Sequence, residues 1–279
     1  MSSGKVLGVN FKQTRWMSFL FACTMAASVL TVLTGCAGVA PNAERKDIVT
    51  DSDEPDVRRR ARIRLELAIG YFEQGQATIA LDEIKQALTT DPTYGDAHNV
   101  RGLIYMRLND PRMAEESFRR ALVLKPRDPD TLHNLGWMQC QQARYAEAGK
   151  QFADALANPN YGGRSKTWMA QGLCQMRDGQ AAQAEQSLLR SYELDAGNPI
   201  TGYNLAKVLL DRGDLVRAQF YIRRINNGEL ANAESLWLGI KIERRLNNNE
   251  GAAQLASQLR KRFGQSRELA AFDRGAFDE

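Results

Sequence analysis

A repeated pattern of small and aromatic residues constrains the fold of this 279-residue chain more than any other feature. Within residues 95–128, two apolar segments have the spacing of helices. The small residues Gly102 and Ala114 allow two antiparallel helices to approach closely, and Tyr105 and Phe118 fill the space between them. The segment therefore predicts a helix–turn–helix unit.

The same offsets recur 34 residues upstream and 34 residues downstream. After residues 158–163 the phase shifts by two residues, and the pattern continues through a fourth and a fifth copy to a degenerate sixth around Trp237. The matching residues are Leu67, Ala68, Tyr71, Ala80, Ile84 and Ala87; Leu135, Gly136, Ala148, Phe152 and Ala155; Trp168, Gly172, Ala184 and Leu188; and Leu205, Ala206, Ala218 and Ile222. A helix–turn–helix period of about 34 residues is typical of tetratricopeptide repeats. We predict an all-α, right-handed superhelical solenoid of about six such repeats over residues 57–263.

The first 35 residues have the organisation of a secretory signal. Three cations precede an uncharged stretch from residue 16 to residue 33. This stretch is nearly long enough to span a bilayer, so an uncleaved anchor is the alternative. Leu33-Thr34-Gly35-Cys36 resembles the lipobox of bacterial lipoproteins, which implies cleavage and lipidation of Cys36. Ala37 in place of an aspartate resembles lipoproteins of the outer membrane, so we expect lipid anchoring on its periplasmic face.

Two further segments flank the predicted array. Residues 36–56 are poor in large apolar residues and rich in acids, which predicts a flexible tether between lipid and array. Residues 264–279 contain Phe272 and Phe277 among charged residues, and the sequence allows either a capping helix or a frayed tail.

Signals for catalysis are absent from the sequence. The only histidines are His98 and His133, and neither has Cys or carboxylate neighbours at metal-ligand spacing. We find no phosphate-binding loop and no hydrolase motif. Without the signal segment the chain carries 34 basic and 33 acidic residues, a balance that argues against nucleic acid. We therefore expect a protein that is not an enzyme and has no cofactor, metal or small-molecule substrate.

The function then depends on a surface. In tetratricopeptide folds the first helix of each pair lines a concave groove, with positions two, five, six, nine and twelve facing it. The groove residues predicted in this way are Leu65, Ile69, Phe72, Asn99, Leu103, Met106, His133, Asn134, Trp137, Met169, Leu173, Met176, Tyr203 and Asn204. Methionines and aromatic residues would form an adaptable trough for a peptide or helix. For Leu65, Leu103 and Leu173, helix position alone does not separate groove from core. Asn134 and Asn204 occupy position six, where family members that bind extended peptides often carry asparagine.

The combination of lipobox, acidic tether and about six repeats resembles the PilF/PilW family of type IV pilus biogenesis lipoproteins. The supporting segments are residues 133–136 leading to 140 and 143–148; 158–161; 172–174; and 236–239. The sixth repeat departs from the pattern at Lys241, where a small residue is expected. The resemblance implies a pilotin, a lipoprotein that binds subunits of the pilus secretin and aids their localisation and multimerisation. Two alternatives stay open: a periplasmic adaptor that scaffolds cell-wall enzymes, and an enzyme with an unrecognised site.

The last expectation concerns two thiols. Cys140 and Cys174 are 34 residues apart, one repeat length, and fall on the first helices of adjacent repeats. Such helices pack side by side, which can bring the Cα atoms within disulfide distance. The periplasm is oxidising, so we expect a disulfide. The two-residue phase shift argues against the pairing, because it moves the residues to positions twelve and ten.

Overall fold

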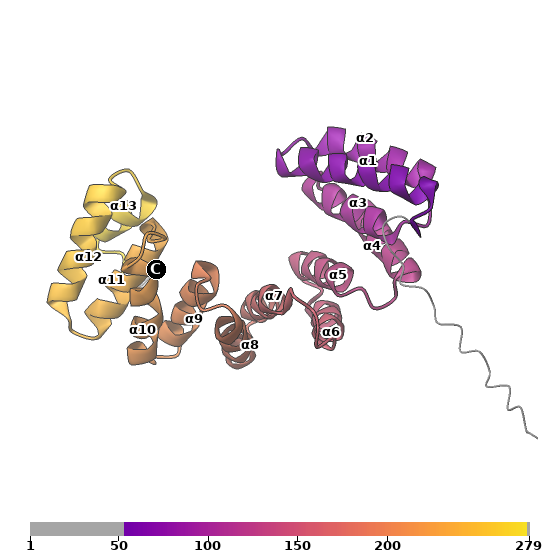
Figure 1. Cartoon of the computed structure of the whole chain (residues 1–279). Coiled ribbons are helices and arrows are strands. Elements are labelled where there is room, and N and C mark those ends of the chain that lie inside the picture. The colour runs from indigo at the N-terminus through magenta and orange to yellow at the C-terminus, as the bar shows by residue number, and fades with distance from the viewer. Residues whose placement is uncertain (1–52, 278–279) are drawn as a thin grey trace, which may run out of the picture. The chain divides into compact units, whose positions relative to one another are not determined.

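A computed structural model describes residues 53–277, and within this range the chain forms thirteen α-helices and no strand (Figure 1). Twelve of the helices form six consecutive antiparallel pairs, and one short helix follows them. The helices are α1 (Asp56–Glu73), α2 (Ala77–Thr90), α3 (Gly95–Arg107), α4 (Pro111–Leu124), α5 (Pro129–Gln141), α6 (Tyr145–Leu156), α7 (Arg164–Arg177), α8 (Ala181–Leu194), α9 (Pro199–Asp211), α10 (Leu215–Asn226), α11 (Ala233–Arg245), α12 (Asn249–Arg262) and α13 (Arg267–Asp273). The prediction of an all-α tetratricopeptide array with about six helical pairs is confirmed.

The backbone marks the repeats as clearly as the side chains do. One residue with positive φ follows the first helix of every pair and lets the chain turn into the second helix. These residues are Gly75, Asn109, Ala143, Gly179, Gly213 and Asn247. Their spacing is 34 residues throughout, except for 36 between Ala143 and Gly179. Counting this residue as position fifteen, the repeats begin at residues 61, 95, 129, 165, 199 and 233, with the phase shift where the sequence indicates it.

Close approach within a pair depends on a small residue at position eight. A Cβ atom added at Gly102 would overlap the Phe118 ring, and one at Gly136 would meet the Phe152 ring. Both phenylalanines are fully buried. The small-and-aromatic pattern of the sequence is therefore a packing rule, in which a large side chain of the second helix occupies the space that glycine leaves on the first.

The core runs along the array as a series of linked clusters rather than one centre. Each first helix from α3 to α11 contacts its own second helix, both helices of the preceding repeat, and the first helix of the following unit. A repeat buries its apolar faces only when neighbours lie on both sides.

The segment after the sixth pair forms a helix, which resolves the alternative that the sequence left open. Helix α13 contacts α11 and α12, and the Ser266 side chain caps it by accepting a hydrogen bond from the Leu269 backbone N–H. Gly275, with φ of +72°, follows it as the left-handed residues follow the first helices. Helix α13 thus takes the place of the first helix of a seventh repeat.

The signal segment, Cys36 and most of the tether lie outside the described residues, so the predictions on them stay predictions. Among residues 53–277, no helix combines the length and the apolar character that crossing a membrane requires.

Candidate partner-binding surfaces

The predicted groove residues separate into core and surface. Leu65 and His133 are buried. For Leu65, which the sequence left between groove and core, burial favours the core, and the assignment of His133 to an open groove is wrong. Leu65 belongs to the core shared by the first two repeats. His133 lies between α5 and the α7 helix of the next repeat. The position in the repeat does not decide exposure by itself, because a residue facing the groove can also be covered by the following first helix.

His133 has a structural role between two repeats. Its Nδ1 lies 2.9 Å from the Thr167 hydroxyl of the next repeat, and its ring lies 6.0 Å from that of Phe152, measured between centroids. Burial, with a smaller contribution from the charge of Lys166, lowers the pKa of His133 from 6.5 to about 4. The imidazole is therefore neutral near pH 7 and joins two repeats.

Most of the remaining groove residues are partly exposed. Six of them also pack on the core: Phe72, Leu103, Met106, Trp137, Met176 and Tyr203. Ile69 is exposed, and Asn99, Asn134, Met169, Leu173 and Asn204 are half-buried.

The asparagines already have partners inside the chain. The amide Nδ2 of Asn134 donates to Oδ1 of Asn99 at 3.0 Å and links two repeats. Asn204 Nδ2 donates to the backbone carbonyl of Ile200 at 2.8 Å, within its own helix. Contact of Asn134 and Asn204 with a ligand backbone stays a prediction, and it now requires rearrangement of these bonds.

Arginines from the next repeat cover two groove aromatics. The guanidinium carbon of Arg177 lies 5.1 Å from the Trp137 ring centroid, and that of Arg107 lies 5.9 Å from the Phe72 centroid. Both separations suit a cation–π contact. Trp137 and Phe72 therefore present an amphipathic surface, apolar at the ring and cationic at its edge.

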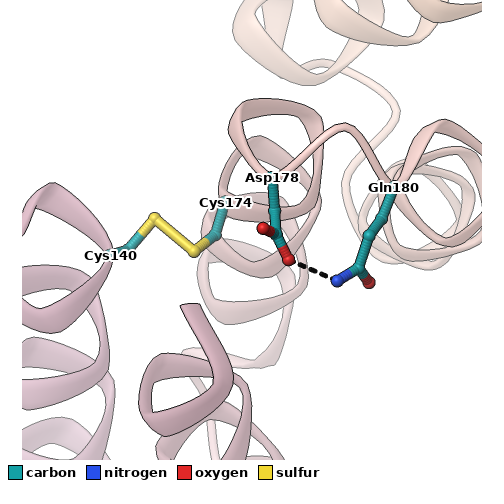
Figure 2. The surroundings of a disulfide bond; sticks show 4 residues. All are labelled: Cys140, Cys174, Asp178 and Gln180. Atoms are coloured by element: carbon teal, nitrogen blue, oxygen red, sulfur yellow. Dashed lines mark hydrogen bonds between the residues drawn. A yellow bond between two sulfur atoms is a disulfide. The ribbon is translucent and has the colours of Figure 1, made fainter. Parts of the chain in front are cut away.

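In the structure, Cys140 and Cys174 are joined by a disulfide, and their Cα atoms lie 5.8 Å apart (Figure 2). The bond links α5 to α7 across the boundary where the phase shifts. Both cysteines are buried. Near Cys174, the turn into α8 is held by Gln180 Nε2, which donates to the Asp178 carboxylate. The disulfide lies between repeats three and four, beneath the groove residue Trp137.

A second surface, absent from the sequence predictions, lies on the outer face of α1. Ile63, at position three, is 51% exposed. In repeats two to six this position faces the preceding repeat: Thr167 contacts His133 of repeat three, and the Thr201 hydroxyl lies 3.0 Å from that of Ser191. The residues at position three of repeats two to six are Ala97, Thr131, Thr167, Thr201 and Ser235, each 2% exposed or less. Within residues 53–277 no repeat precedes α1, so the same face of this helix is open there.

The open face has an apolar floor and a hollow. Leu67 is 44% exposed, and Gly70 occupies position ten, where repeats two to six carry a larger buried side chain. A Cβ added at Gly70 would meet nothing within 4 Å. We call Ile63, Leu67, Gly70 and Tyr71 the end surface; Glu66 and Gln74 also line its hollow. The sequence signal for it was available: Ile63 is larger, and Gly70 smaller, than the residues at these positions in the other repeats.

The fold defines this chain as a tetratricopeptide repeat protein. The family model for the tetratricopeptide repeat matches residues 65–130 and 100–165. The chain is 33% identical to PilW, a widely conserved type IV pilus biogenesis factor, in a crystal structure with a TM-score of 0.70; the match covers 76% of this chain and 97% of PilW. The chain belongs to the PilF/PilW family of tetratricopeptide repeat proteins.

The similarity to PilF extends along both chains. The type IV pilus assembly protein PilF of Pseudomonas aeruginosa is 27% identical over 247 residues, which cover 88% of this chain and 97% of PilF. A crystal structure of PilF superposes with a TM-score of 0.72 over 79% of this chain and 100% of that structure. The shared part is therefore the entire repeat array rather than one local motif.

Proposed function

We propose that this protein is a pilotin, an outer-membrane lipoprotein that binds secretin subunits and aids their localisation and multimerisation for type IV pilus biogenesis. The observation that supports this most is the match to PilF and PilW along nearly the full length of those chains. Because tetratricopeptide arrays bind with surfaces assembled from several repeats, a full-length match preserves the arrangement of such surfaces.

The end surface is the proposed contact with the secretin. It combines exposed apolar residues, a hollow at Gly70 and a polar rim that includes Glu66 and Gln74. An apolar centre with a polar rim is the usual anatomy of a protein interface. A partner helix can pack on α1 as each first helix packs on the preceding repeat, placing a large apolar side chain at Gly70.

The concave groove is the proposed second contact, for an extended or helical segment of the same partner. Trp137 and Met169 offer apolar contact, and Asn134 and Asn204 offer hydrogen bonds once their internal bonds rearrange. Covering an apolar segment of an unassembled secretin subunit would protect it from aggregation until its own strands pair. The mechanism is binding rather than turnover.

The anchor in this proposal is a lipid on Cys36. Residues 37–55 separate that cysteine from α1, and a flexible coil of this length spans roughly 25 Å. The end surface is then the first part of the array after the tether. Secretin subunits would be held next to the outer membrane, where the ring is built.

Deletion of the gene, followed by complementation, tests the proposal. We expect the deletion strain to lose surface pili and secretin multimers while keeping its cell shape, and the wild-type gene to restore both. A gene for Cys36→Ser is expected to produce protein that takes up no fatty acid label and leaves the outer membrane. Normal secretin multimers in the deletion strain would contradict the proposal, and altered shape or septation would favour the cell-wall adaptor.

A further inference from the structure

The end of the described chain returns to the concave groove. Helix α13 stops at Asp273, and the turn at Gly275 reverses the chain. Two short backbone bonds fix the turn: Ala276 N–H donates to Ala271 O at 3.0 Å, and Phe277 N–H donates to Gly275 O at 2.9 Å. The turn places the Phe277 side chain beside α11.

Phe277 contacts residues that occupy groove positions of the sixth repeat. Its ring centroid lies 5.3 Å from that of Trp237, at position five. The guanidinium carbon of Arg244, at position twelve, lies 3.8 Å from the Phe277 centroid. Phe272 closes the cluster edge-to-face, with its centroid 5.9 Å away. An aromatic ring between an indole and a guanidinium makes both of the contacts that bind such rings most strongly.

Leu269 lies at the centre of the contact between α13 and the array, buried in one cluster with Leu236, Ile240 and Leu259, and Phe277 packs at the edge of this cluster. Phe277 is half-buried and lines an open hollow between α9 and α11, together with Tyr203, Lys207, Trp237 and Lys241. It therefore lies on the groove side of the sixth repeat, at the edge of the contact made by α13.

We propose that the slot between Trp237 and Arg244, at the edge of this hollow, binds an aromatic side chain of a partner protein, and that Phe277 occupies the slot in the free chain as an intramolecular ligand. A partner that displaces Phe277 presents its phenylalanine or tyrosine to Trp237 and Arg244. This site is separate from the end surface on α1 and does not depend on the identity of the partner bound there.

The charges around the hollow indicate what accompanies the aromatic residue. Lys207 pairs with Asp211 at 3.2 Å, so these two charges offset one another. Arg244 and Arg245 add two cations of the sixth repeat on this side. The partner segment therefore carries carboxylates beside its aromatic residue. The chain's own sequence has this character, since Phe277 is followed by Asp278 and Glu279.

A labelled peptide with the sequence of residues 274–279, Arg-Gly-Ala-Phe-Asp-Glu, is the probe, and its binding to the full chain is measured by fluorescence polarisation. An intramolecular ligand that occupies the site about nine-tenths of the time weakens apparent affinity roughly tenfold. We expect Phe277→Ala to bind the peptide at least that much more tightly than the wild type. Phe220→Ala, which removes an exposed phenylalanine from α10, is the matched control and should bind like the wild type.

Two further measurements secure the interpretation. A chain truncated after Arg274 keeps α13 and should bind the peptide like Phe277→Ala, with unchanged helical circular dichroism. Adding Trp237→Ala to Phe277→Ala, or replacing phenylalanine by alanine in the peptide, should abolish binding. Equal peptide binding by the wild type and Phe277→Ala, or no binding by either, overturns the proposal.

Discussion

The two ends of the array differ in whether a further helix covers their outer face. At the C-terminal end, α13 covers the face that a seventh repeat would cover, and Leu269 is buried in the contact. At the N-terminal end, no described residue covers the outer face of α1, and Ile63 and Leu67 are exposed. Stacked repeats always leave one apolar face at each end, and terminal repeats usually acquire a polar outer face. An end face that stays apolar is therefore the natural place for a partner to stack, whereas at the other end α13 already occupies the stacking face.

In the middle of the array each repeat has neighbours on both sides, and the largest change in unfolding free energy is expected from removing the disulfide there. Replacing both Cys140 and Cys174 by alanine opens a loop of one repeat, which the chain-entropy model values at about 4 kcal/mol of unfolding free energy. We expect urea denaturation to show this loss, while hydrogen exchange still distinguishes a protected α13 from an accessible face of α1. Two free thiols in the folded wild-type protein, detected by mass spectrometry, would contradict the disulfide between Cys140 and Cys174.

His133 provides a pH-dependent test of the same interior. Its pKa is about 4 in the folded chain and 6.5 when exposed, so the unfolded state binds more protons between these values. The contribution of neutral His133 to the unfolding free energy is therefore fully present above pH 6.5. It is lost as the pH drops toward 4 and amounts to about 3 kcal/mol in total. His133→Gln can still bond to Thr167 but does not titrate. Its unfolding free energy should fall less over this window, and parallel curves for the two proteins would refute the assignment.

The stability of the capped end should depend on the buried side chain of Leu269. Leu269→Ala removes buried methyl groups between α13 and the cluster of Leu236 and Leu259, at an expected cost of about 2–3 kcal/mol. Because the change affects the last repeat first, hydrogen exchange in α12 should increase before that in α5. A loss below 0.5 kcal/mol would show that α13 does not stabilise this end.

The open end should tolerate the same kind of change. Leu67→Ala truncates a side chain that is 44% exposed, and we expect the free energy of unfolding to change by no more than about 0.5 kcal/mol. The same denaturation experiment on Leu67→Ala and Leu269→Ala compares the two ends in one assay. A loss equal to that of Leu269→Ala would mean that another segment of the chain covers α1, and the contrast between the ends would fail.

The sequence predicted the interior of the array well, because every interior repeat meets the same neighbours. The packing of Gly102 against Phe118 follows from a rule that recurs about every 34 residues, and the two-residue phase shift of the sequence reappears as the 36-residue step after Ala143. Exposure was less predictable. His133 and Leu65 occupy groove positions of their repeats, yet they are buried against neighbouring helices. Whether such a residue is exposed depends on the side chains of the next repeat and not on its position within its own repeat.

The ends escaped prediction for a related reason. A repeat pattern describes residues between neighbours, and it carries no information about a repeat that has none on one side. Ile63 and Gly70 differ from their counterparts in the other repeats, so a comparison of equivalent positions contained the signal. For Phe277 there was no such signal, because its place in the groove depends on the turn after α13.

Binding of the secretin to the end surface tests the central claim most directly. The full chain, Ile63→Asp and the matched control Val216→Asp, which changes an exposed apolar residue on α10, are titrated against the secretin of the same organism. A carboxylate buried in an apolar contact is costly, so Ile63→Asp should weaken binding at least about tenfold while Val216→Asp binds like the wild type. Wild-type affinity of Ile63→Asp, with both variants folded, would contradict the claim that the uncapped end of the array receives the partner.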